Sequence, residues 1–199
     1  MILIGILGGV ASGKSAVSNR LKMLGAVVLD ADRAGHEVLR EPEVKEALRR
    51  RWGDAVFDAA GEVDRRKVAG IVFAETCRGR EELAFLEQLT HPRIERRLRG
   101  QLEELSLRGV RVAVLDAPVM LKAGWDRMCD GLVFVDTPRH VRLARARQRG
   151  WTEAVLAARE AAQEPLETKR RRAVTLIDNS SSWEHLHEQV DRFWRSVSG

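Results

Sequence analysis

The chain alternates short apolar runs with longer stretches in which apolar residues recur every three or four positions. The short runs predict buried strands, and they cover residues 1–7, 26–29, 110–115, 132–135 and 174–177. Strands separated by helices are typical of a parallel sheet with helices on both faces. The pattern therefore predicts an α/β fold with a five-stranded parallel sheet.

The stretch between Leu29 and Val110 has no strand pattern. Helical spacing covers residues 32–52, interrupted by Pro42, and residues 53–61 have the composition of a turn or loop. Asp64 is placed to cap a helix that runs to Phe73, and residues 81–107 are strongly helical. Pro92 predicts that a new helix starts within this last stretch. We interpret the whole region as a helical insert that forms a substrate-binding lobe.

Residues Gly8 to Ser15 read Gly-Gly-Val-Ala-Ser-Gly-Lys-Ser and fit the phosphate-binding P-loop, G-x-x-x-x-G-K-[ST]. A strand pattern precedes the loop and a helix pattern follows it, whereas the alternative is a glycine-rich turn with an incidental lysine. Lys14 is expected to bind the β- and γ-phosphates and the Ser15 hydroxyl to bind Mg²⁺. The expected nucleotide-binding residues here are Gly9, Val10, Ala11, Ser12, Gly13, Lys14, Ser15 and Ala16.

Four of the five strand patterns end in an aspartate, and ligands bind beyond the carboxyl ends of strands in open parallel sheets. Asp30 and Asp32 follow the second strand, which in P-loop kinases usually neighbours the first. Phosphoryl transfer to a hydroxyl needs a proton acceptor, and we assign this role to Asp32; capping of the next helix is the alternative. Asp116 matches a Walker B carboxylate that holds Mg²⁺. Asp136 and Asp178 are expected to be ordinary turn residues.

Five arginines lie between Arg139 and Arg149, and three of them, Arg142, Arg145 and Arg149, share one helical face. An arginine-rich helix that leads into a flexible segment at Gly150 is typical of a lid over transferring phosphates. An ordinary basic helix face is the alternative. The runs 49–51 and 170–172 carry three arginines each without aromatic residues, and we interpret them as solvated helix faces.

The composition of the 199-residue chain narrows the choice of ligand. Its net charge is +5, and only six of its 34 basic residues are lysine. The basic charge by itself fits a polyanionic small molecule and nucleic acid equally well. Arginine binds phosphate in bidentate fashion, and coding bias is the alternative explanation of its excess over lysine. We expect neither nucleic acid nor a membrane as partner. The two cysteines are far apart, which favours the reduced cytoplasm. No apolar run approaches a membrane span, and the oligomeric state is left open.

The order of these motifs resembles the dephospho-CoA kinase family over nearly the whole chain. The resemblance rests on the P-loop, on Asp30-Ala31-Asp32-Arg33 and on His91-Pro92-Arg93-Ile94. Further segments that fit are 114–118, 135–138, 145–150, Gln163 and 177–179. Departures occur at Leu7, where members usually have threonine, at Lys122, where an acidic residue is common, and at Val174, where members have Ala-Asp before the fifth strand.

This resemblance implies ATP-dependent phosphorylation of the ribose 3′-hydroxyl of dephospho-CoA, with Mg²⁺. It implies a nucleotide-binding core (residues 1–58, 110–138 and 173–199), a helical substrate lobe (about 60–108) and a lid (about 139–170). Lys14, the base Asp32 and the lid residue Arg149 would be catalytic. We assign nucleotide binding also to Arg145 and Asn179, substrate binding to Asp32, His91 and Arg93, and metal binding to Ser15 and Asp116.

Two other functions remain as alternatives. The first is another P-loop small-molecule kinase, with a nucleoside, nucleotide or shikimate-like acceptor. The second is a nucleotide-dependent switch, which needs a guanine-reading Asn-Lys-x-Asp segment that this sequence does not contain.

Overall fold

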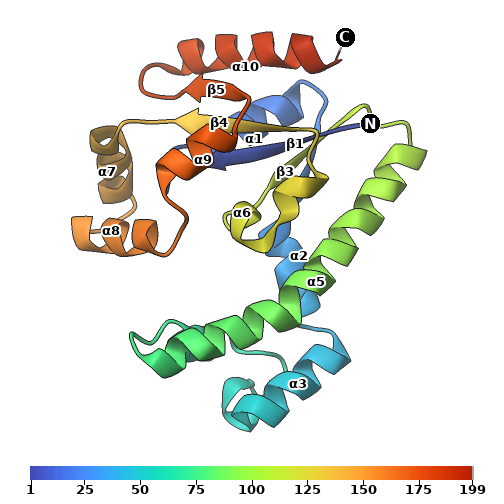
Figure 1. Ribbon diagram of the computed structural model, residues 1–199, viewed down its shortest axis with the longest axis vertical. Helices are drawn as coiled ribbons and strands as arrows, with labels where there is room; N and C mark the ends of the chain where they lie inside the picture. Colours follow the sequence, from blue (N-terminus) through green and yellow to red (C-terminus); the bar gives the residue numbers. More distant parts are fainter. Residues whose placement is uncertain (199) are drawn as a thin grey trace. The chain divides into compact units, whose positions relative to one another are not determined.

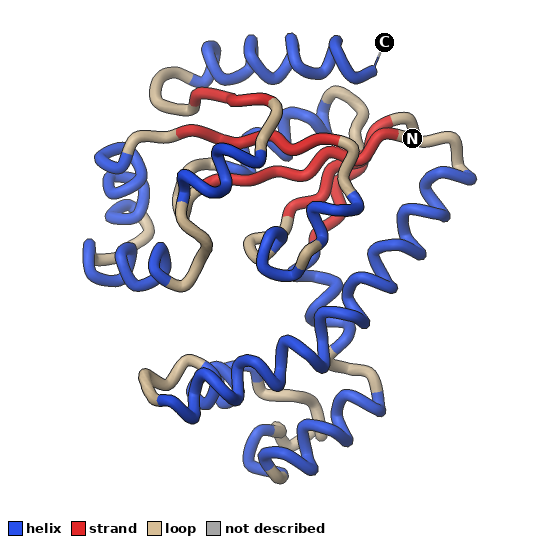
Figure 2. Tube along the Cα trace, viewed as in Figure 1, coloured by secondary structure: helices blue, strands red, loops and turns tan. Residues whose placement is uncertain are grey.

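The computed structural model describes residues 1–198 and contains one five-stranded sheet in which every neighbouring pair of strands is parallel (Figures 1 and 2). The strands are β1 (Ile2–Gly8), β2 (Val27–Asp30), β3 (Val112–Asp116), β4 (Gly131–Asp136) and β5 (Thr175–Asp178). Their order across the sheet is β2-β3-β1-β4-β5. The predicted α/β class is thus confirmed. The expected pairing of the first two strands is wrong, because β3 lies between them and brings Asp116 opposite Asp30.

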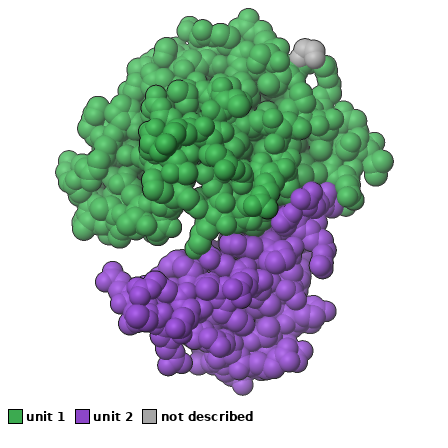
Figure 3. Space-filling model, in the orientation of Figure 1, with its two compact units in different colours: residues 1–30, 102–199 green, residues 31–101 purple. Residues whose placement is uncertain are grey.

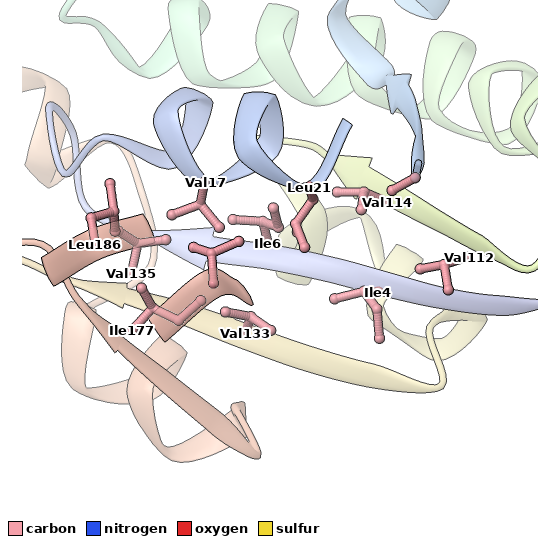
Figure 4. Packing of buried hydrophobic residues seen from close by; sticks show 12 residues of the cluster. Ile4, Ile6, Val17, Leu21, Val112, Val114, Val133, Val135, Ile177 and Leu186 are labelled. Carbon is pink, nitrogen blue, oxygen red and sulfur yellow. The ribbon is translucent and has the colours of Figure 1, made fainter. Parts of the chain in front are cut away.

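One face of the sheet packs against the helices α1 (Lys14–Met23) and α10 (Trp183–Ser198). Ile4 and Ile6 of β1 belong to this buried cluster, together with residues of β3, β4 and β5. In Figure 4, Val17 and Leu21 of α1 point toward these strand side chains. Full burial of such an aliphatic side chain contributes about 1.5–3 kcal/mol relative to exposure, which explains why the central strand β1 is an unbroken apolar run.

The alternate residues of β1 face the other side of the sheet, where the chain approaches closely. A Cβ atom at Gly5 would lie 2.6 Å from Leu132 and 2.8 Å from the sulfur of Met120. Met120 begins α6 (Met120–Ala123), and α9 (Leu166–Arg172) packs on β1 and β4. Helices therefore cover both faces of β1, and they hold the P-loop at its carboxyl end.

The chain divides into two compact units, coloured separately in Figure 3. We call residues 1–30 and 102–199 the sheet unit and residues 31–101 the helical unit. The helical unit contains α2 (Ala31–Val38), α3 (Pro42–Trp52), a 3₁₀ turn (Asp54–Val56), α4 (Arg65–Val72) and most of α5 (Cys77–Leu107). The Asp64 side chain accepts hydrogen bonds from the backbone N–H groups of Arg66 and Lys67, as expected for the cap of α4.

The long helix α5 corrects one prediction. Residues 77–107 form a single helix with Pro92 inside it, so no new helix starts at that proline. Proline removes one backbone hydrogen bond and bends a helix, and the α5 ribbon is bent in Figure 1. Ile94 and Leu98, which follow the proline, are buried. Burial of this apolar face stabilises the continued helix against the lost bond.

The segment between β4 and β5 contains α7 (Arg139–Gln148), α8 (Glu153–Ala161) and α9. Arg139 donates to Glu153 across 2.7 Å, and Arg142 pairs with Glu160, so two ion pairs join α7 to α8. Within residues 1–198 no helix is both long enough and apolar enough to span a membrane. Cys77 and Cys129 are free thiols, and burial raises the pKa of Cys129 to about 12.

Candidate active site

The P-loop leaves β1 and enters α1 through two residues with left-handed backbone. Ala11 has φ 59° and Gly13 has φ 90°. A Cβ atom at Gly13 would lie 2.2 Å from the Asn179 side-chain nitrogen, so glycine is required there by space as well as by conformation. Successive left-handed and right-handed residues turn backbone N–H groups toward one centre, which forms an anion-binding nest.

Three side chains from separate segments hold the back of this loop through one atom, the Ser12 carbonyl oxygen. It accepts hydrogen bonds from Thr137 Oγ1 at 2.9 Å, Arg145 Nη1 at 3.0 Å and Asn179 Nδ2 at 2.8 Å. Arg145 also donates to the Asn179 carbonyl oxygen at 3.0 Å. Burial, and then the charge of Arg149, lowers the pKa of Arg145. Both Arg145 and Asn179, predicted to bind nucleotide, therefore contact the P-loop itself.

The Ser12 hydroxyl, unlike the Ser12 carbonyl oxygen, has no hydrogen-bond partner in the described structure. Ser12 is 1 % exposed, and its Oγ has no hydrogen-bond partner within residues 1–198. A buried polar group without a partner costs about 1–3 kcal/mol. A phosphate oxygen in the nest would remove this cost, so the loop fits the anionic ligand that its sequence predicts.

Two lysines lie beside the loop. Lys14 Nζ donates to the Gly9 carbonyl oxygen at 3.4 Å. Lys169, on α9, is 3 % exposed and lines the same crevice as Lys14. The sequence analysis did not single out Lys169, because the neighbouring run of arginines indicated a solvated helix face. Its position three residues after Leu166 was the available signal, since residues at that spacing share a helix face.

Side-chain oxygens that are suitable as metal ligands lie at the ends of β2 and β3. Asp30 and Asp116 are opposite one another in the parallel register, and Ser18 Oγ of α1 donates to Asp116 Oδ2 at 3.3 Å. Asp32 follows within the first turn of α2 and is exposed. Mg²⁺ takes oxygen ligands and is held by one or two carboxylates together with substrate phosphates. The donor chemistry here suits that ion.

The three lid arginines predicted to share one face have different partners. Arg142 is 4 % exposed; its Nε donates to the Thr137 carbonyl oxygen at 3.1 Å, and it pairs with Glu160. Arg145 binds the P-loop backbone, as described above. Arg149 is exposed, and its guanidinium lies 5.7 Å from the centre of the Trp151 ring. Only the last of the three leaves its charged end on the surface.

The two substrate-binding residues predicted on α5 belong to the helical unit. His91 is partly exposed. Arg93 Nη1 donates to the Leu89 carbonyl oxygen at 2.8 Å, and its Nε lies 3.7 Å from Glu41. The Arg93 guanidinium thus already has two partners within its own unit, which restrains it in one orientation.

Comparison with known proteins identifies the family. A family model described as dephospho-CoA kinase matches residues 2–185. The chain belongs to the dephospho-CoA kinase family. A dephospho-CoA kinase of Symbiobacterium thermophilum is 37% identical over 100% of this chain and 82% of its own length. One from Geobacter sulfurreducens is 36% identical, covering 98% of both chains. The family transfers a phosphoryl group from ATP to dephospho-CoA.

Solved structures show the same fold. A Thermus thermophilus protein superposes with a TM-score of 0.81 at 35% identity, covering 100% of this chain and 98% of its own. The dephospho-CoA kinase of Campylobacter jejuni has a TM-score of 0.68 at 20% identity, covering 99% of this chain and 98% of its own. At this lower identity the likeness extends to the fold alone. A P-loop α/β fold of this family is therefore the architecture of the chain.

Proposed function

We propose that this dephospho-CoA kinase binds ATP in the nest formed by residues 9–16 and phosphorylates the ribose 3′-hydroxyl of dephospho-CoA, with Asp32 as base. The observation that carries the nucleotide part is the buried, unpartnered Ser12 hydroxyl inside a P-loop whose backbone is held by three donors. A site organised before the ligand arrives stabilises the charge of the transition state without reorganisation.

In the proposed step the 3′-hydroxyl oxygen forms a bond to the γ-phosphorus, and the bond from that phosphorus to the β–γ bridging oxygen breaks. The hydroxyl proton passes to the Asp32 carboxylate, and ADP leaves. Lys14 stabilises the negative charge on the phosphates. Ser15 and Asp116 would hold Mg²⁺, which neutralises phosphate charge when bound.

The remaining assignments belong to the same proposal. His91 and Arg93 bind the acceptor as part of the helical lobe of about residues 60–108. Residues 139–170 act as the lid, and Arg149 contributes charge when the lid closes. The cytoplasm as location, and the absence of nucleic-acid partners, also remain part of this proposal.

The experiment is a coupled assay of ADP release with dephospho-CoA, adenosine, AMP and shikimate as acceptors. We expect kcat/KM to be highest for dephospho-CoA, because specificity is a difference in transition-state binding. We expect Leu7 and Lys122, which differ from the residues usual in the family, to weaken acceptor binding relative to other members without changing this order. A value for adenosine or AMP equal to or above that for dephospho-CoA would overturn the acceptor assignment in favour of another small-molecule kinase.

A further inference from the structure

Lys169 is a buried cation with few partners. It lies on α9 and is 3 % exposed, and its ammonium nitrogen donates to the Gln163 amide oxygen at 2.7 Å. Within residues 1–198 this is the one hydrogen bond of the ammonium group, and the group forms no ion pair with a carboxylate. An ammonium group carries three N–H donors. Buried charges are normally paired, so two donors and a full charge remain without the partner that burial requires.

The surroundings of this ammonium point to where the missing anion binds. Lys169 lines a narrow, closed crevice together with Lys14, with Gly8 at the start of the P-loop and with the Ala117–Pro118 segment, and an anion would bind at its edge rather than inside it. That segment follows Asp116, the proposed metal ligand, directly in the chain. The crevice also includes the apolar side chains of Ile6, Leu7 and Leu121. Two lysines thus meet at the end of the sheet where the phosphates are expected.

The electrostatics agree with this geometry. Burial lowers the pKa of Lys169 to about 8, the charge of Lys14 lowers it further, and Glu164 acts in the opposite direction. Like charges placed close together in a buried site repel one another. An arriving polyanion offsets that repulsion and favours the charged form of Lys169. The neutral Gln163 amide holds the ammonium in position without competing as a carboxylate would.

We propose that Lys169 is a second phosphate-binding cation of this site, which donates to an oxygen of the terminal phosphate of a nucleoside triphosphate on the side of the P-loop next to Ala117–Pro118. Its position on α9 links the lid segment to the transferring group. The inference rests on the proposed function in one respect, since it requires ATP in the P-loop nest. Arg145, by contrast, donates to the carbonyl oxygens of Ser12 in the loop and of Asn179 after β5.

The test compares Lys169→Met with the wild type by calorimetric titration of ADP and of β,γ-imido-ATP. We expect the affinity for the imido analogue to fall about tenfold or more, and that for ADP to change less than about threefold, because only the analogue carries the terminal phosphate. The value of kcat should fall on the order of 10²-fold. Equal weakening of both nucleotides, or a lowered melting temperature with unchanged affinities, would show a purely structural lysine and overturn the proposal.

Two further variants keep the result interpretable. Arg171→Met changes an exposed cation two residues along α9, which pairs with Glu167 at 3.5 Å, and should leave affinities and kcat unchanged. If Lys169→Met does not fold, Lys169→Arg retains the charge, and it should still bind the imido analogue more tightly than ADP. Loss of that preference in folded Lys169→Arg counts against the proposal. Failure of the wild type to bind either nucleotide would instead refute the proposed function.

Discussion

The cationic side chains of the two units differ in the partners that hold them. In the helical unit, Arg51 pairs with Glu82 at 2.8 Å, and Arg97 pairs with Glu37 at 2.9 Å. Around the P-loop of the sheet unit, Arg145 and Lys169 donate instead to carbonyl and amide oxygens. A cation paired with a carboxylate is neutralised, whereas one held by neutral oxygens keeps its attraction for an anion.

This difference is local to the P-loop rather than general to the sheet unit. Arg20 of α1 pairs with Asp191 of α10 at 2.6 Å, on the face of the sheet that forms the main core. At the P-loop end of the sheet, Arg145 and Lys169 are held by neutral oxygens, whereas Arg142 beside them pairs with Glu160. We infer that pairing with carboxylates builds the scaffold, whereas cations held by neutral oxygens, Arg145 and Lys169, serve the binding site, and the variants below test the contribution of each group.

Lys14→Ala should cause the largest loss. It removes the charge that stabilises the transferring phosphoryl group, and kcat is expected to fall on the order of 10³-fold with an unchanged melting temperature. Steady-state kinetics and thermal unfolding of the same preparation measure both quantities. Lys22→Ala, an exposed lysine at the end of the same helix, is the matched control. Near-normal turnover in folded Lys14→Ala would refute the P-loop assignment.

Asp32→Asn tests whether the helical unit contributes a reacting group as well as scaffold. The side chain keeps its shape but loses its ability to accept a proton, so kcat should fall about 10²-fold while the KM for ATP changes little. Asp30→Asn, two residues earlier at the end of β2, should have a milder effect. The reverse ranking of the two variants would move the base to Asp30.

Arg145→Met removes one of the three donors on the Ser12 carbonyl oxygen. The loop then becomes less rigid before ligand binding, and the affinity for ADP should fall about tenfold, as expected for loss of charged hydrogen bonds. Calorimetric titration measures this affinity. Arg147→Met, on the exposed side of the same helix, is the control. Unchanged ADP binding in a folded Arg145→Met protein would mean that Thr137 and Asn179 suffice to hold the loop.

The elements that sequence reasoning predicted are those whose signals are local. The P-loop, the strand runs and the Asp64 cap each depend on residues within a few positions of one another. The prediction of a helix start at Pro92 was wrong because burial of Ile94 and Leu98 stabilises the helix past the proline. That burial depends on packing partners that are distant in the sequence.

The order of the strands and the surroundings of the site could not be predicted for the same reason. Insertion of β3 between β1 and β2 is a property of the whole sheet. Thr137 donates to the carbonyl oxygen of Ser12, which lies 125 positions earlier in the chain, and no sequence pattern near either residue predicts that contact. Lys169 was hidden in a run of basic residues of which the three arginines are exposed.

Glu82→Gln tests the scaffold half of the comparison. Glu82 is buried and accepts hydrogen bonds from Arg51 and from Trp52 Nε1, and these bonds lower its pKa below the ordinary value of 4.5. A carboxyl group with a lowered pKa in the folded state stabilises the protein above its unfolded pKa, and this contribution disappears as the pH falls through the folded pKa.

The wild type should therefore melt at a higher temperature than Glu82→Gln at neutral pH. The gap should shrink as the pH falls below about 4.5. Melting curves recorded for both proteins across this range measure it. Since the pair is structural, kcat at neutral pH should change little. A constant gap at all pH values would show that the Glu82 charge contributes nothing to stability.

Glu95→Gln should have the smallest effect and sets the scale for the others. Glu95 pairs with Arg99 one turn later on α5 at 2.7 Å, with side chains 36% and 56% exposed. Exposed pairs at this spacing stabilise a helix by about 0.2–0.5 kcal/mol, and salt screens them. Urea unfolding at low salt should show a slightly smaller free energy of unfolding for Glu95→Gln than for the wild type, and this difference should disappear at high salt. Glu95→Gln and Glu82→Gln are the same substitution on the same helix, and they differ in that Glu95 is partly exposed and Glu82 is buried. An equal loss of unfolding free energy in the two variants would mean that burial does not determine the strength of an ion pair in this unit.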